Sequence, residues 1–237
     1  MVELEKVGKL ESPVELFGSP YFVGRLEKSR RITREKGGET GFFIGSVGGD
    51  FYAGEVVEPE LRDCEWSLTD VYGRSFFRGL GENFDNLGGF CEYSSDVYGV
   101  VSYHLHGKSG NFVPSDFDLD SFFRERGEWP RAPIMAIGSL KSGGGRLEVL
   151  ALQEGREKSI FREGDLSRDF CVGSEMAYDL LLDYPDEDIF ELSNREAYER
   201  VKRLGKLGIR TAFLEYRKKG GSLCLCKTTD SVLEFSF

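Results

Sequence analysis

The chain lacks long apolar runs. None of its 237 residues falls in an uninterrupted apolar segment of the roughly 20 residues that a membrane-spanning helix requires. Its first residues, MVELEKVGKLESPVELF, carry charges where a secretion signal is apolar. We therefore expect a cytoplasmic protein that has no membrane partner.

Basic residues are in deficit as well. The chain has 31 Lys and Arg against 41 Asp and Glu, which gives a formal net charge of −10. Nucleic-acid binding requires a basic surface that neutralises phosphates, so we exclude nucleic acid as the main partner. The stretch from Lys28 to Lys36 is a local exception. It fits the solvated face of a helix or, alternatively, a surface that receives an acidic partner.

The cysteines do not form a disulfide framework, because the five of them are odd in number and irregularly spaced. Cys224 and Cys226 have the spacing of half a metal site. The surrounding SLCLCKT alternates like a strand, however, with both cysteines on one face. We favour the interpretation that they are small buried apolar side chains.

Aromatic residues are abundant, and their patterns predict secondary structure. The 19 Phe and 10 Tyr, with a hydrophobic fraction of 40%, are typical of a folded globular protein. Two apolar-aromatic runs flank Val-Gly-Gly-Asp, which predicts a β-hairpin. A strand is predicted at 97–106, a helix from Ser115, and two buried strands at 132–140 and 145–152. Residues 61–96 show no clear period, and we assign them no structure.

This alternation of strands and helices predicts an α/β fold with a mixed central β-sheet flanked by helices. After residue 153 the composition changes to a charged, loop-like segment. We therefore divide the chain into a domain of residues 1–155 and a smaller C-terminal α+β extension of residues 156–237. The extension offers a surface for assembly into a homo-oligomer.

Several elements are expected in the extension. The sequence of residues 173–185 predicts a short helix. Ser193 and Glu196 are spaced as in a capping box, which predicts that another helix begins there. A second hairpin is predicted around Gly220-Gly221, followed by a closing strand in VLEFSF.

The only two histidines of the chain lie two residues apart, in SYHLHGKSGNFVPSDFDL. Residues i and i+2 of a strand project from the same face, so the rings of His104 and His106 are expected side by side. The helix predicted from Ser115 places Asp118 near its start, at the end closest to the strand. Two neutral imidazoles and one carboxylate suit zinc and leave one coordination position open.

A simpler interpretation explains part of this pattern. Ser-x-x-Asp is also an ordinary capping box, with Ser115 as the N-cap and Asp118 at the third helical position. It does not explain why both histidines fall together on a strand just before that cap, so we favour metal binding. Asp116 is a competing ligand if the loop shifts the helix start.

The pattern resembles the JAMM motif of the JAB/MPN metalloprotease family: an upstream Glu, then His-x-His-Pro, six residues, and Ser-x-x-Asp. His104 and His106 match the histidine element, and PSDFDL matches the Ser-x-x-Asp end. The resemblance covers about residues 30–153 and implies the cytidine-deaminase-like fold of that family. Three details depart from the family pattern: Gly107 stands where the family has proline, Leu105 replaces the usual Ser or Thr, and the following loop is one residue longer.

The resemblance implies a role for each site residue. His104, His106 and Asp118 would hold zinc. Glu39, which precedes the strand-like GFFIGS, would act as general base and acid, and Ser115 would donate to the oxyanion.

The implied activity is that of a zinc-dependent, deubiquitinase-like metallopeptidase or isopeptidase. Its substrate would be the amide bond at the C-terminus of a ubiquitin-like small modifier or its conjugates. The alternative is a non-catalytic MPN-type scaffold or interaction module. A zinc nucleobase deaminase is excluded, because the chain lacks the Pro-Cys-x-x-Cys ligands of that class. Glu35 and Glu55 are the substitutes for Glu39 if the register of the motif differs.

Overall fold

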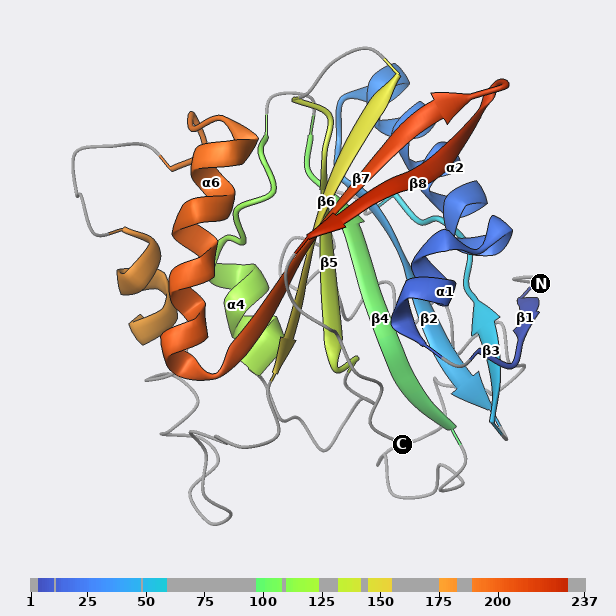
Figure 1. The fold of residues 1–237 in the computed structure, drawn as a ribbon, viewed down its shortest axis with the longest axis horizontal. Coiled ribbons are helices and arrows are strands. Elements are labelled where there is room, and N and C mark those ends of the chain that lie inside the picture. The colour runs from blue at the N-terminus through green and yellow to red at the C-terminus, as the bar shows by residue number, and fades with distance from the viewer. Residues whose placement is uncertain are drawn as a thin grey trace.

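The structure is a computed structural model that describes residues 4–10, 12–47, 49–58, 97–107, 110–123, 132–141, 145–154, 175–182 and 189–229. A single mixed sheet runs through these residues, and helices cover both of its faces (Figure 1). The prediction of an α/β fold with a mixed sheet flanked by helices is confirmed. In the described ranges, no helix has both the length and the apolar character needed to cross a membrane.

The sheet has eight strands in the order β1-β3-β2-β4-β5-β6-β7-β8. The strands are β1 (Glu5–Gly8), β2 (Thr40–Val47), β3 (Asp50–Ala53), β4 (Val97–Leu105), β5 (Ile134–Ser139), β6 (Arg146–Glu154), β7 (Ile209–Lys219) and β8 (Ser222–Thr229). Among these neighbours, β4 and β5 pair in parallel and the others pair antiparallel. The strands predicted at 97–106, 132–140 and 145–152 are therefore confirmed as β4, β5 and β6.

Both predicted hairpins form. β2 and β3 pair up to Val47 and Asp50, and β7 and β8 pair up to Lys219 and Ser222. Gly220 and Gly221 between β7 and β8 have φ angles of 59° and 101°, which L-residues with a side chain rarely adopt. The predicted closing strand, VLEFSF, and the segment 61–96 lie outside the described residues.

The helices form a layer on each side of the sheet (Figure 1). α1 (Pro13–Gly18) and α2 (Pro20–Lys36) cover one face, whereas α4 (Asp116–Phe123), the helical residues 175–181 and α6 (Asn194–Val201) cover the other. A 3₁₀ helix, η3 (Lys202–Leu207), continues α6 towards β7. α6 begins with the predicted capping box of Ser193 and Glu196.

Each face of the sheet has its own hydrophobic core. Side chains of β4 point alternately to one face and to the other. Tyr103 and Leu105 are fully buried in the core beneath α1 and α2. Because neighbouring residues of a strand point to opposite faces, His104 points to the other side, where α4 lies. The alternation of β4 thus carries the histidines away from α2 and towards α4.

The interpretation that Cys224 and Cys226 are both buried is wrong. Cys224 is partly exposed and Cys226 is exposed. The reason is that β8 is an edge strand, and the helices cover it on one side, where Leu223 and Leu225 pack into the core. The cysteines alternate with these leucines and point to the opposite side.

The boundary predicted at residue 155 falls between β6 and β7, which pair along their whole length from Arg146 to Glu154. The described part of the predicted extension thus adds two strands to the sheet and α6 to one of its faces. The division into a domain and an extension stays a prediction.

Candidate metal centre

The two histidines and Asp118 meet at the C-terminal end of β4. His104 Nε2 lies 3.1 Å from His106 Nε2 and 3.3 Å from Asp118 Oδ1, and His106 Nε2 lies 3.5 Å from Asp118 Oδ2. Within the described residues these three side chains form a group able to hold a metal ion, and their ligand atoms all lie within 4.8 Å of one another. Their exposed fractions are only 1% for His104, 6% for His106 and 7% for Asp118. Three buried donors that converge in this way could bind a metal ion.

The ring of His106 is oriented by the main chain of the loop that follows it. His106 Nδ1 is hydrogen-bonded to the carbonyl oxygen of Asn111. A carbonyl oxygen only accepts, so Nδ1 carries the proton and donates. In the neutral ring Nε2 is therefore left with a lone pair directed at His104 and Asp118, as a metal ligand requires.

Asn111 is itself fixed by contacts from the C-terminal part of the chain. Its side-chain nitrogen donates to the carbonyl oxygens of Ile189 at 2.7 Å and Leu192 at 3.2 Å, and its side-chain oxygen accepts from the Val113 backbone at 2.8 Å. The side chain is fully buried. Asn111 thus links the 189–192 segment to the ring of His106, because its side chain contacts that segment and its carbonyl oxygen accepts from the ring.

Asn111→Ala keeps the main-chain carbonyl that accepts from His106 but removes the side-chain hydrogen bonds that fix its position. Metal affinity is therefore expected to fall, by no more than the about 10- to 100-fold that loss of an outer-shell partner costs. The substitution should also destabilise the fold by about 1–3 kcal/mol, because the buried carbonyl group of Ile189 and the half-buried one of Leu192 lose their donor. Competition with a metal-chelating dye measures the first effect and thermal unfolding the second. Ser121→Ala, which removes a polar contact on the exposed face of α4, is the control and should leave metal affinity unchanged.

Asp118 is both a candidate ligand and part of a capping box. The Ser115 backbone N–H and hydroxyl both donate to Asp118 Oδ2 at 2.7 Å, while the Asp118 backbone N–H donates to Ser115 Oγ at 3.2 Å. Oδ1 is the oxygen closer to His104. The simpler interpretation of Ser-x-x-Asp is therefore correct but does not compete with metal binding, because the cap holds the carboxylate in place against the histidines. Asp116, the competing ligand, is exposed and lies outside the group.

Charges within the group are strongly coupled. Burial alone would raise the pKa of Asp118, but the adjacent His104 and His106 outweigh it and hold that pKa well below its ordinary value. Burial alone would lower the pKa of His106, yet its hydrogen bond to Asp118 and the negative charges of Asp118 and Glu39 raise it. The site is thus electrostatically suited to a cation.

Glu39 lies directly before β2 and is half-buried. In the antiparallel pairing of β2 with β4, Thr40 is opposite Leu105 and Gly41 is opposite His104. Continuing this register by one residue places Glu39 opposite His106, on the same face of the sheet. This placement explains why its negative charge raises the pKa of His106. Glu39 is not part of the three-residue group itself.

The main chain at Glu39 is anchored through the next residue. The hydroxyl of Thr40 is buried and lies 2.5 Å from the hydroxyl of Ser29 and 2.9 Å from that of Thr33, both on α2.

The two substitutes for Glu39 lie elsewhere: Glu35 is on α2 beside Arg34, and Glu55 follows β3 in a groove with Arg25.

Gly107 and Gly110, in the loop that follows His106, lie where a larger side chain would be too close to its neighbours. A Cβ atom at Gly110 would lie 2.7 Å from the Cβ of His106, closer than such atoms approach. A Cβ atom at Gly107 would lie 3.0 Å from the carbonyl oxygen of Gly37, where α2 ends. Glycine at position 107 therefore has a local reason, since the end of α2 leaves little space at this position.

No protein family, curated protein or solved structure matches this chain. A proposal for the function therefore rests on the geometry of the site and on the pattern of its residues in the sequence.

Proposed function

We propose that the protein is a zinc-dependent metallopeptidase or isopeptidase. The observation that carries this proposal is the convergence of His104, His106 and Asp118 beside Glu39. Two imidazoles, one carboxylate and a second, separate carboxylate are the groups that zinc-assisted amide hydrolysis needs.

Zinc fits the donor set in both chemistry and spacing. A tetrahedral ion with bonds of about 2.0–2.1 Å separates its ligands by about 3.3–3.4 Å. His104 Nε2 and His106 Nε2 lie 3.1 Å apart, and each is close to a different oxygen of Asp118: Oδ1 is 3.3 Å from His104 and Oδ2 is 3.5 Å from His106. Three protein ligands leave one position open, which is typical of catalytic rather than structural zinc sites.

When bound, zinc would lower the pKa of a water molecule towards neutrality and polarise the scissile carbonyl. Glu39 would accept a proton from the attacking water and return it to the nitrogen of the departing amine as the C–N bond breaks. The register of β2 against β4 supports this assignment, because it places Glu39 opposite His106, whose pKa the negative charge of Glu39 helps to raise. Asp118 is occupied by Ser115 and the histidines, which leaves Glu39 as the proton carrier.

Ser115 would donate a hydrogen bond from its hydroxyl to the oxyanion that develops on the substrate. Without substrate this hydroxyl donates to Asp118 Oδ2. Ser115→Ala is therefore expected to lower kcat by about 10²–10³ while the protein still binds zinc. The measurement is steady-state cleavage together with metal content. Loss of zinc in this variant would contradict the role, because it would mean that Ser115 acts only by positioning Asp118.

The substrate class we propose is the amide bond at the C-terminus of a ubiquitin-like small modifier. Its support is the resemblance of the motif to the JAMM pattern. The test is incubation of the zinc-loaded protein with a modifier whose C-terminal glycine is joined to a reporter amine, followed by mass spectrometry of the products. Cleavage at the glycine supports the enzyme. Bound zinc with all such substrates intact would favour the non-catalytic MPN-type scaffold instead.

A further inference from the structure

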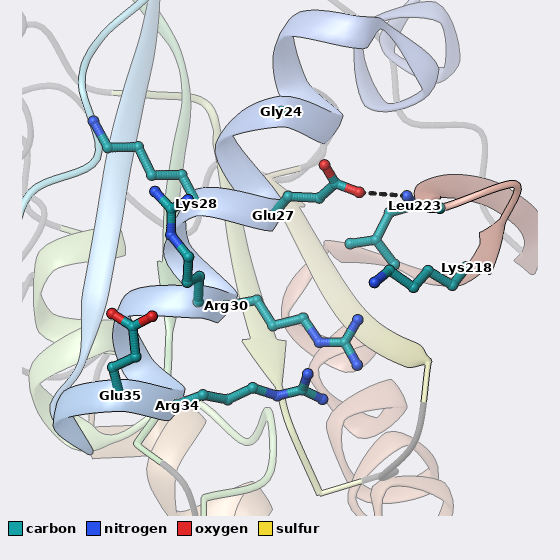
Figure 2. A pocket seen from close by; sticks show the side chains of 10 residues that line it. Gly24, Glu27, Lys28, Arg30, Arg34, Glu35, Lys218 and Leu223 are labelled. Atoms are coloured by element: carbon teal, nitrogen blue, oxygen red, sulfur yellow. Dashed lines mark hydrogen bonds between the residues drawn. The ribbon is translucent and has the colours of Figure 1, made fainter.

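The face of the sheet opposite the metal centre carries a second site, a basic pocket between α2 and the β7–β8 hairpin (Figure 2). Its volume is about 570 Å³, within the roughly 300–1,000 Å³ of small-molecule sites. Of the residues that the structure describes, five basic and two acidic ones line it, in a chain whose net charge is −10. The lining residues are Gly24, Glu27, Lys28, Arg30, Arg31, Arg34, Glu35, Lys218, Gly221 and Leu223.

The basic groups on one side of the pocket converge. Figure 2 shows the side chains of Arg30 and Arg34, one turn apart on α2, extending in the same direction, towards the side on which Lys218 of the hairpin lies. Arg30 is only 5% exposed. Burial and the neighbouring charge of Arg34 lower the pKa of Arg30. Like charges held together in a partly buried concavity attract an anion, which relieves their repulsion.

The acidic residues of the lining offset this charge only in part, because burial and Arg34 outweigh the effect of the negative charge of Glu27 on the pKa of Arg30. Glu27 accepts a hydrogen bond from the Leu223 backbone at 2.6 Å, so it joins the hairpin to α2 and fixes the two walls of the pocket. Glu35 points away from the guanidinium groups of Arg30 and Arg34 (Figure 2). The side of the pocket that faces the hairpin is therefore positively charged.

We propose that this pocket binds a small molecule that carries more than one phosphate charge. Three cationic groups, from Arg30, Arg34 and Lys218, exceed the charge of a single carboxylate but match a diphosphate or triphosphate. Guanidinium groups bind phosphate oxygens bidentately, and an ammonium group adds a point charge. Among the described residues, the lining contains no aromatic ring on which a base would stack, so the phosphate groups themselves are the recognised feature.

Calorimetric titration with inorganic triphosphate tests the site. Binding to the unaltered chain is expected at low salt and should weaken as NaCl rises from about 0.05 to about 0.5 M, because salt screens the charges. Arg34→Gln and Lys218→Gln should each lower affinity by about tenfold or more, since each removes a charge-assisted hydrogen bond. Both side chains are exposed, so these changes leave the core intact.

Matched controls separate this site from general electrostatics and from metal chelation. Arg195→Gln on α6 and Lys206→Gln in η3 remove the same charges from exposed positions outside the pocket and should not change affinity. Asp118→Asn should also bind triphosphate normally, because the metal centre lies across the sheet. The proposal is overturned by an absence of binding, by equal losses in the controls, by loss of binding in Asp118→Asn, or by tighter binding of a glutamate-rich peptide than of triphosphate.

Discussion

Protein that carries both His104→Ala and His106→Ala is expected to purify without zinc, whereas the unaltered chain should hold about one zinc per chain. The reason is that the substitutions remove two of the three donors that converge at the end of β4. The affinity should fall by far more than the about 10- to 100-fold that loss of an outer-shell partner costs. Elemental analysis after purification without added metal, followed by titration with zinc, measures the change.

Both histidines are buried, so the double variant leaves cavities and its fold must be checked separately. Asp118→Asn provides a second test of nearly the same shape, because an asparagine oxygen still accepts from the Ser115 backbone. It should also lose zinc, since a neutral amide replaces the anionic ligand. Asp116→Asn removes the same charge from the exposed neighbouring position and should keep zinc. If the double histidine variant retains a full equivalent of zinc, the ion is bound elsewhere and the assignment of the centre is wrong.

The three donors could be predicted from sequence because each depends on a local rule. Alternation along β4 places His104 and His106 on one face, and the capping spacing places Asp118 in the first turn of α4. Each of these rules involves only a few consecutive residues. By spacing alone, the capping box and the candidate metal site are competing interpretations of Ser-x-x-Asp. In the structure the same hydrogen bonds form the cap and hold the carboxylate beside the histidines.

The support of the site could not be predicted, because it depends on contacts between distant parts of the chain. Asn111 donates to Ile189, which lies 78 residues further along. Glycine at position 107 is favoured by the end of α2 at Gly37, a contact that follows from how the helix packs on the sheet. No periodicity in the sequence encodes these pairings.

The burial of the cysteines was predicted wrongly for a related reason. The alternation of SLCLCKT correctly indicates a strand, but it does not say which face is covered or whether the strand lies at an edge. The β7–β8 hairpin instead buries Leu223 against α2, and this packing creates the basic pocket. The basic run from Lys28 to Lys36 therefore lies beside the β7–β8 hairpin, a neighbour that the sequence alone does not identify.

Glu39→Gln is expected to lower kcat for amide cleavage by about 10²–10⁴ without loss of zinc. Glutamine keeps the size and hydrogen-bonding capacity of the side chain but cannot carry the proton between water and the departing amine. Because Glu39 lies outside the group of three donors, its replacement leaves all of them in place. A proton carrier acts in the transition state, so KM should change little while kcat falls.

Glu55→Gln is the matched control, because Glu55 is the alternative candidate yet lies in a groove beside Arg25. It should cleave at the rate of the unaltered chain. Single-turnover cleavage of the modifier–reporter amide gives the rate of the chemical step, and metal analysis of the same samples gives the zinc content. Unchanged cleavage in Glu39→Gln would remove Glu39 from the mechanism. A fall in zinc content parallel to the fall in rate would instead make Glu39 a ligand, because the register of β2 against β4 brings its carboxylate to the face of His106.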